Sequence, residues 1–123
     1  MKPQKFIFED TKKVDLKTKV IYKYPSLSRL LELNYMVVNG RHPENKNEYV
    51  IEHDCQFIIY VIKGNGKIYA GGEIFDVKAG DAVYVPAENK FAAEGQNFEY
   101  ITVETPAWYP EQAEVVLELH KEK

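Results

Sequence analysis

The sequence predicts an all-β domain, an antiparallel sandwich or barrel, and three observations predict it. Apolar and polar residues alternate with a period of two over several stretches, as they do in half-buried strands. Glycine-rich turn signals recur roughly every 6 to 15 residues from residue 64 onward, which is the spacing of hairpins and not of βαβ units. Nine Tyr and six Phe favour sheet, and no stretch has a long helical period.

Three alternating stretches define expected strands, in chain order. The first places Leu16, Thr18, Val20, Tyr22 and Tyr24 on one face and Lys17, Lys19 and Lys23 on the other. The second sets Leu31, Leu33, Tyr35 and Val37 against Glu32 and Asn34. The third sets Phe98, Tyr100 and Thr102 against Glu99, Ile101 and Val103. Each pattern is typical of a half-buried strand.

Turns and loops separate these strands. The glycines at 64 and 66 predict a hairpin turn, and Gly80-Asp81 predicts a strand-entry turn in which Asp81 caps backbone amides. Residues 41–47, which include a proline and several polar residues, are expected to form a flexible loop at the barrel mouth. Pro106 and Pro110 predict an extended tail. Between them, Trp108 and Tyr109 form either an interface or a lid over the core.

Two segments carry a family resemblance. Residues 50–66 read VIEHDCQFIIYVIKGNG, and residues 79–91 read AGDAVYVPAENKF. They resemble the two sequence motifs of the cupin superfamily. The resemblance implies an antiparallel double-stranded β-helix, the jelly-roll barrel, over about residues 14–105 of a single cupin-like domain 1–123.

The same resemblance bears on metal binding, because cupin motifs usually present three His and one Glu as metal ligands. Aligning Gly64 and Pro86 with the motifs places Ile51, His53, Phe57 and Phe91 at these four positions. Open metal sites commonly use three protein ligands, and this set offers one imidazole. We therefore expect no metal and no other cofactor in the barrel.

The residues at these positions are the candidate site. The alignment projects His53 into the barrel, where it either contacts a ligand, acts as an acid or base, or is purely structural. Phe57 and Phe91 either close the cavity as core or stack on a sugar or planar ligand. Ile59 and Val61 share the parity of Phe57 and should face the same interior, with Ile51 completing the candidate cavity.

Cys55 offers two further readings. A His53-x-Cys55 metal pair is conceivable on one strand face, but no third ligand is identifiable, because Glu48, Glu52 and Asp54 fall on the opposite face of a regular strand. A nucleophilic role has no basic partner other than His53. As the lone cysteine it forms no internal disulfide, which suits the reducing cytoplasm, and no signal peptide or apolar run of membrane-spanning length is found.

These features leave three expected functions. The first is a non-metal small-molecule binding protein, carbohydrate-related by analogy with sugar-linked cupins. The second is a metal-independent sugar isomerase or epimerase, although polar barrel residues for it are not identifiable in the sequence. The third is a sensing or interaction module. A net charge of −3 and a pI near 5.6 disfavour nucleic acid as a partner, and no membrane partner is expected.

A homodimer is also expected. Lys17, Lys19 and Lys23 line one face of a predicted edge strand, and residues 115–117 form an apolar strand without a place in a closed eight-strand barrel. We expect terminal segments of one chain to pair with the sheet of another, with Trp108 and Tyr109 nearby.

Overall fold

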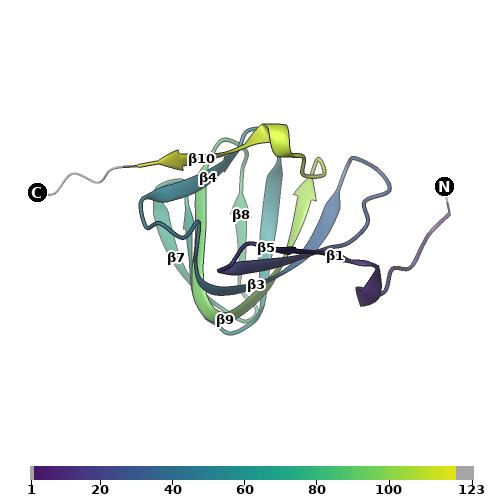
Figure 1. The fold of residues 1–123 in the computed structure, drawn as a ribbon, viewed down its shortest axis with the longest axis horizontal. Helices are drawn as coiled ribbons and strands as arrows, with labels where there is room; N and C mark the ends of the chain where they lie inside the picture. The colour runs from purple at the N-terminus through teal and green to yellow at the C-terminus, as the bar shows by residue number, and fades with distance from the viewer. Residues whose placement is uncertain (1, 119–123) are drawn as a thin grey trace, which may run out of the picture.

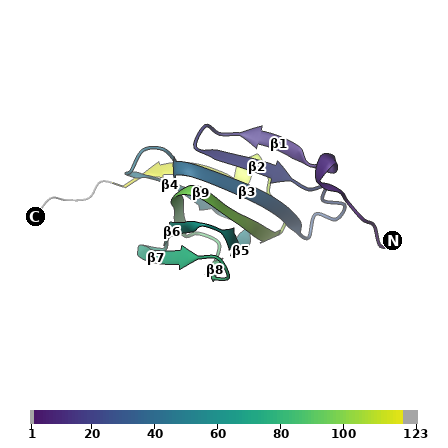
Figure 2. The ribbon, with the colours of Figure 1, turned by 90° about the horizontal axis from the view of Figure 1, so that it is seen from below.

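Ten strands form one continuous, strongly curled antiparallel sheet in the computed structural model, which describes residues 2–118 (Figures 1 and 2). The strands are β1 (Lys12–Asp15), β2 (Lys19–Lys23), β3 (Glu32–His42), β4 (Glu48–Glu52), β5 (Gln56–Lys63), β6 (Asn65–Ala70), β7 (Glu73–Lys78), β8 (Ala82–Val85), β9 (Lys90–Thr105) and β10 (Ala113–Leu117). Two 3-10 turns, η1 (Phe8–Asp10) and η2 (Pro110–Gln112), precede β1 and β10. The predicted all-β fold is confirmed.

Strand β9 is the central strand of the barrel, because it pairs with four other strands. Its second half lies between β3 and β5, whereas its first half lies beside β4 and β6. The strand bends near Gly95, where Asn97 has a φ of 46°. The Phe98 ring fills the inside of this bend, and a Cβ at Gly66 would lie 2.4 Å from it. Bending one long strand around an aromatic ring allows a single sheet to close on itself.

The turns are confirmed where glycine and aspartate predicted them. Gly64, with a φ of 80°, joins β5 to β6. The carboxylate of Asp81 accepts a hydrogen bond of 2.9 Å from the Lys78 amide.

One end of the barrel interior is a close-packed apolar core. Its buried residues come from alternate positions of β3, β5, β6, β7, β8 and β9, as the period-two pattern requires. Phe98 and Tyr100 pack with their ring centres 5.3 Å apart at its centre. The other end of the interior, toward β1, β2, β4 and β10, is not filled by apolar side chains and holds the cavity described below.

The inward faces of β2 and β3 differ from the sequence expectation. The alternation is present, but the lysine face of β2 and the Glu32–Asn34 face of β3 point into the barrel. Lys19 is 8% exposed and Asn34 is 2% exposed. The apolar residues of the opposite face form an outer cluster, in which Tyr22 packs against Phe8 at 4.9 Å and Tyr35 at 5.7 Å between ring centres. Polar residues of a strand usually face solvent outside the protein. On β2 and β3 they face the internal cavity instead, and the apolar residues face outward.

The segment 41–47 is more constrained than a flexible loop. Arg41 and His42 belong to β3, and Arg41 is buried. Its guanidinium donates to the carbonyl oxygens of Pro43, Asn45 and Glu48, and it stacks 5.0 Å from the centre of the Tyr49 ring. These bonds fix the connection between β3 and β4.

The tail also has a place within its own chain. Residues 113–117 form β10, which pairs with β4 in antiparallel register, so the expectation that this strand has no partner in the barrel is wrong. Figure 1 shows β10 lying along β4 at the edge of the barrel. Within residues 2–118, the structure contains no helix with the length and apolar character needed to cross a membrane.

Candidate functional site

A cavity of about 540 Å³ opens between β1, β2, β3, β4 and the C-terminal tail. This is within the ordinary size range of small-molecule sites. Much of its wall is apolar, including Ile21, Met36, Val50, Phe91 and Trp108, and polar side chains are set among these residues. The polar side chains best suited to binding or proton transfer come from four strands, β2, β3, β4 and β9: Lys19, Asn34, His42, Glu52 and Glu104.

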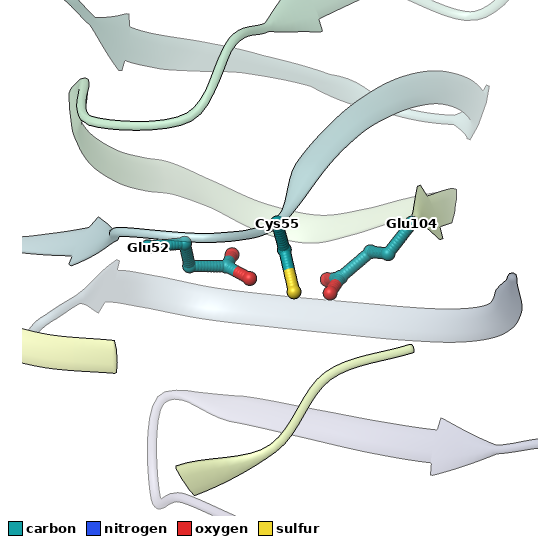
Figure 3. A group of neighbouring side chains, drawn as sticks. All are labelled: Glu52, Cys55 and Glu104. Carbon is teal, nitrogen blue, oxygen red and sulfur yellow. The ribbon is translucent and has the colours of Figure 1, made fainter. Parts of the chain in front are cut away.

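Two carboxyl groups that line this cavity lie close to a buried thiol. One carboxyl oxygen each of Glu52 and Glu104 and the sulfur of Cys55 all lie within 4.8 Å of one another. Figure 3 shows the Cys55 side chain between the two carboxyl groups, with all three directed into the same space. Glu104 is 4% exposed and Cys55 is fully buried, so water screens these two side chains only weakly from their neighbours.

Glu104 is held in its neutral form. Burial, followed by the neighbouring carboxyl groups of Glu52 and Glu32, raises its pKa to about 9, whereas Lys19 opposes that rise. Burial also raises the pKa of Glu52, against the lowering effect of Gln112 and Glu104. Because two adjacent carboxylates cannot both ionise cheaply, the pair shares one proton near neutral pH.

Lys19 supplies the opposite charge. Burial lowers its pKa to about 8, and the nearby carboxyl groups of Glu104 and Glu52 oppose that fall. Its Nζ lies 5.8 Å from the centre of the Phe91 ring. Among residues 2–118 its ammonium makes no ion pair within 4.0 Å, so it is available to a ligand. The site thus contains an amine and a carboxylic acid that both titrate within about two units of neutrality.

His42 lines the same cavity as a neutral imidazole. Burial lowers its pKa to about 4, with further lowering from the positive charges of Lys19 and Arg41. A neutral ring offers one donor and one acceptor nitrogen to a ligand.

Cys55 is an unreactive member of the group. Burial and the acidic neighbours Glu52, Glu104 and Asp54 raise its pKa to about 12. Its thiol donates to the Pro106 carbonyl at 3.3 Å. The nucleophile is the thiolate, so a thiol held in this way does not act as one near neutral pH.

Gln112 connects the tail to the carboxyl pair. Its Nε2 donates to Glu52 Oε1 at 3.2 Å, and its Oε1 accepts from the amides of Asp54 and Cys55 at 3.1 and 3.2 Å. Gln112 is 4% exposed although η2, which contains it, lies in an otherwise exposed segment. The tail is therefore one wall of the site.

Trp108 belongs to this wall, and the centre of its ring lies 5.2 Å from Nζ of Lys23. This position favours the interpretation of Trp108 as part of a lid over its interpretation as part of an interface.

Two of the candidate residues predicted from the sequence lie outside the cavity. His53 is exposed, and its ring nitrogens lie 2.8 Å from Glu88 and 2.8 Å from Glu114, so the expectation that it projects into the barrel is wrong. Ile51 does not line the cavity, whereas its neighbours Val50 and Glu52 do. The reason is local: β4 ends at Glu52 and the chain bends before β5 begins at Gln56, which resets the parity that the motif alignment assumed.

The remaining candidates are interior residues. Phe57 and Phe91 are both buried and meet edge to face, with ring centres 5.1 Å apart. Phe91 lines the cavity, whereas Phe57 lies in the core with Ile59 and Val61. A role for any of them in ligand binding stays a prediction.

The usual cupin metal ligands do not fit this interior. Two of the four motif positions are occupied by Phe57 and Phe91, whose rings meet edge to face, and His53 and Ile51 lie elsewhere. The alternative group of Glu52, Cys55 and Glu104 holds protons on Cys55 and Glu104 near neutral pH and has the Lys19 ammonium beside it. A metal ion would have to displace those protons and tolerate that charge.

Sequence reasoning missed Lys19, Asn34, His42, Glu52 and Glu104. For Glu104 the signal was present, because it continues the inward row of Phe98, Tyr100 and Thr102 by one more alternate position. Asn34 likewise continues the row of Met36 and Val38. A polar residue that continues an inward row of apolar residues is therefore a sequence pattern that can predict a cavity.

Comparisons with known proteins agree with this architecture. A family model described as Cupin domain matches residues 39–103. Pac13 from Streptomyces, described as a nucleoside dehydratase, has a TM-score of 0.82 at 18% identity over 97% of this chain and 95% of that one. A variant of it with uridine has a TM-score of 0.83 at 18% identity, over 98% and 95%.

Two further structures share the fold at lower similarity. KdgF from Halomonas has a TM-score of 0.70 at 17% identity, covering 87% of this chain and 96% of its own. An RmlC-like cupin from Shewanella frigidimarina has a TM-score of 0.70 at 20% identity, over 86% and 93%. No curated protein matches the sequence. At these identities the likeness shows the fold alone.

Proposed function

This chain belongs to the cupin family, and on that premise we propose that its cavity binds a small, carbohydrate-related molecule without a metal ion. The observation that carries the proposal is a group of buried or partly buried polar side chains, Lys19, Glu52 and Glu104, that line one cavity. Burying these groups costs stability, because a charged or polar group loses its interactions with water. Only well-placed partners within the protein can replace those interactions. A cost of this kind at the wall of a cavity supports a binding site over a structural role.

A second candidate function is favoured by the two groups that titrate near neutrality. Lys19, with a pKa of about 8, is partly a free amine at neutral pH and is suited to accept a proton. Glu104, with a pKa of about 9, holds a proton that it can donate. A metal-independent isomerase, epimerase or dehydratase needs this combination.

The proton transfers of such a reaction are easily balanced. Lys19 would take the proton from a carbon next to a carbonyl group, and the bonding electrons would move toward the carbonyl. In a dehydration the carbon–oxygen bond at the adjacent position then breaks, and Glu104 gives its proton to the leaving hydroxyl to form water. The dehydratase class has support from Pac13, a nucleoside dehydratase of the same fold.

The test is a ligand screen on protein purified without a chelator and without an affinity tag. Metal analysis comes first, and we expect less than stoichiometric transition metal. Uridine, other nucleosides, sugars and sugar phosphates are then compared by thermal shift. A ligand at ~100 times its dissociation constant adds about 2.7 kcal/mol to the free energy of unfolding.

Each outcome decides between the functions. A ligand that binds and is converted, as followed by proton NMR, supports the enzyme, whereas one that binds unchanged supports a binding or sensing module. A stoichiometric transition metal, or binding that a chelator abolishes, would contradict the metal-independent proposal.

A further inference from the structure

Two lysines face each other on the wall of the cavity. The antiparallel register of β1 and β2 places Lys12 directly opposite Lys23, and both residues line the cavity. Figure 2 shows these two strands side by side at one edge of the sheet. Like charges directly opposite each other destabilise a sheet. A negatively charged group placed between the two ammonium groups would relieve their repulsion.

The other charged groups of the cavity already have partners of opposite charge. The pairs are Lys23 with Glu32 at 2.8 Å, Glu114 with His53 at 2.8 Å, and Lys19 with the nearby carboxyl groups of Glu104 and Glu52. Lys12, in contrast, makes no ion pair within 4.0 Å among residues 2–118. The excess positive charge on the cavity wall therefore lies at Lys12, opposite Lys23.

Both lysines are open to a group that enters the cavity. Lys12 is exposed, and the side chain of Lys23 is 26% exposed. Of the three N–H groups on Nζ, Lys23 uses one on Glu32 and keeps the others free. Trp108 adjoins the pair, because its ring centre lies 5.2 Å from Nζ of Lys23, and it too is partly exposed. The cavity wall thus offers two ammonium groups beside an aromatic ring.

A phosphate ester matches these donors better than other ligand groups do. It carries a charge of about −1.5 to −2 near neutral pH and three terminal oxygens, so it can accept from both lysines at once. A carboxylate has one charge and two oxygens, and a hydroxyl group has no charge to offset the repulsion.

We propose that Lys12 and Lys23 bind a phosphate group of the ligand, beside Trp108. The inference rests on the proposed function and narrows it, because it assigns the carbohydrate-related ligand to compounds that carry a phosphate ester, as sugar phosphates and nucleotides do. Lys19 and Lys23 are four residues apart on the same face of β2, which separates their Cα atoms by about 13 Å. They can therefore contact different groups of one ligand.

The fluorescence of Trp108 reports on this subsite directly, because the chain has one tryptophan. The probe is inorganic phosphate, titrated into the full chain at pH 7 with the ionic strength held constant by chloride. We expect a saturable change in the emission of Trp108, and a much weaker one when acetate replaces phosphate. No saturable change with phosphate, or an equal response to acetate, would overturn the subsite.

Variants of Lys12 with a matched control complete the test. Lys12→Met keeps the aliphatic stem, removes the charge and should weaken phosphate binding several-fold, whereas Lys12→Arg keeps the charge and should retain most of the affinity. Lys13→Met removes a charge from the next residue of β1, which is exposed but does not line the cavity, and should bind phosphate as the native chain does. Equal phosphate affinity in Lys12→Met and the native chain would contradict the proposal.

The ligand screen separates this subsite from the proposed function. A sugar phosphate should bind more tightly than its parent sugar, and Lys12→Met should remove that advantage. A ligand that depends on Lys19 and Glu104 but binds Lys12→Met and the native chain equally would leave the proposed function standing and remove only this subsite. Inorganic phosphate that binds through Lys12, when no sugar or sugar phosphate binds, would keep the anion site and contradict the proposed function.

Discussion

Glu104 is the residue on which the proposed chemistry of this site depends, because its surroundings favour a protonated carboxylic acid near neutral pH. Its pKa is raised to about 9 by burial and by the carboxyl groups of Glu52 and Glu32. Lys19 keeps the carboxyl pair from becoming an uncompensated buried negative charge. The three groups are coupled, so a change at one alters the protonation of the others.

This coupling predicts a pH dependence that one substitution removes. The folded protein binds the Glu104 proton up to a higher pH than the unfolded chain, so the contribution of this group to stability is complete below about pH 4.5 and is lost as the pH rises through about 9. Glu104→Gln imitates the protonated acid and does not titrate. The native chain should therefore lose stability relative to Glu104→Gln across this range, by at most about 1.4 kcal/mol per pH unit.

Urea unfolding of both proteins at intervals from pH 4 to pH 9 measures this difference. Glu73→Gln, a substitution on the exposed surface of β7, serves as the control and should follow the native curve. Parallel curves for the native chain and Glu104→Gln would show that Glu104 ionises normally.

At the scale of elements, the tail from Pro106 to Leu117 is an integral part of the cavity, of which it forms one wall. It contributes Trp108 and η2 to the cavity, and Gln112 bonds both to the Glu52 carboxyl and to two amides of the bend before β5. The position of Glu52 in the site is therefore coupled to the docking of the tail.

Gln112→Leu tests this coupling. It leaves the Asp54 and Cys55 amides without their acceptor and should cost about 1–3 kcal/mol of stability. Gln112→Glu keeps an acceptor for both amides but puts a third carboxyl group beside Glu52, so it should retain more stability than Gln112→Leu at low pH and lose that advantage as the pH rises. Thermal unfolding at pH 5 and pH 8 measures both. Equal behaviour of the two variants at both values would mean that Gln112 does not position Glu52.

The strands also show what the sequence could predict and what it could not. The turns at Gly64 and Gly80-Asp81 and the buried row of Phe57, Ile59 and Val61 could be predicted, because local backbone preference and period-two burial act over a few residues. The positions of Lys19 and His53 could not. Lys19 faces inward because the barrel is partly empty, and His53 faces outward because a bend after β4 resets the parity. Both depend on the closed fold and not on local pattern.

At the scale of the whole molecule, the family resemblance predicted the barrel because cupin motifs consist of turn residues and buried positions, which hold the fold regardless of activity. The activity depends on which inward positions are polar, and in this chain those positions lie on β2, β3, β4 and β9, with few of them inside the two motifs. The motif alignment therefore predicted the fold correctly, but of its candidate residues only Phe91 lines the cavity, and His53 and Ile51 lie outside it.

The association state stays a prediction at this scale. A homodimer was expected partly because the last strand lacked a partner, and β10 now has one in β4 of the same chain. Light scattering of the full chain and of a truncation after Thr105 separates the remaining possibilities. A dimer that survives truncation would place the interface away from the tail, and a monomeric full chain would contradict the homodimer.

The central claim is that a cavity without a metal ion binds its ligand through Lys19 and Glu104. The most direct test is calorimetric titration, in the presence of a chelator, of the best ligand from the thermal-shift screen into the native chain, Lys19→Met and Glu104→Leu. Lys67→Met and Glu73→Leu, on the exposed strands β6 and β7, are the matched controls. We expect tenfold or greater weakening in both cavity variants, equivalent to about 1.4 kcal/mol or more, and native affinity in both controls. Native affinity in Lys19→Met and Glu104→Leu, or binding that disappears when the chelator is added, would contradict the claim.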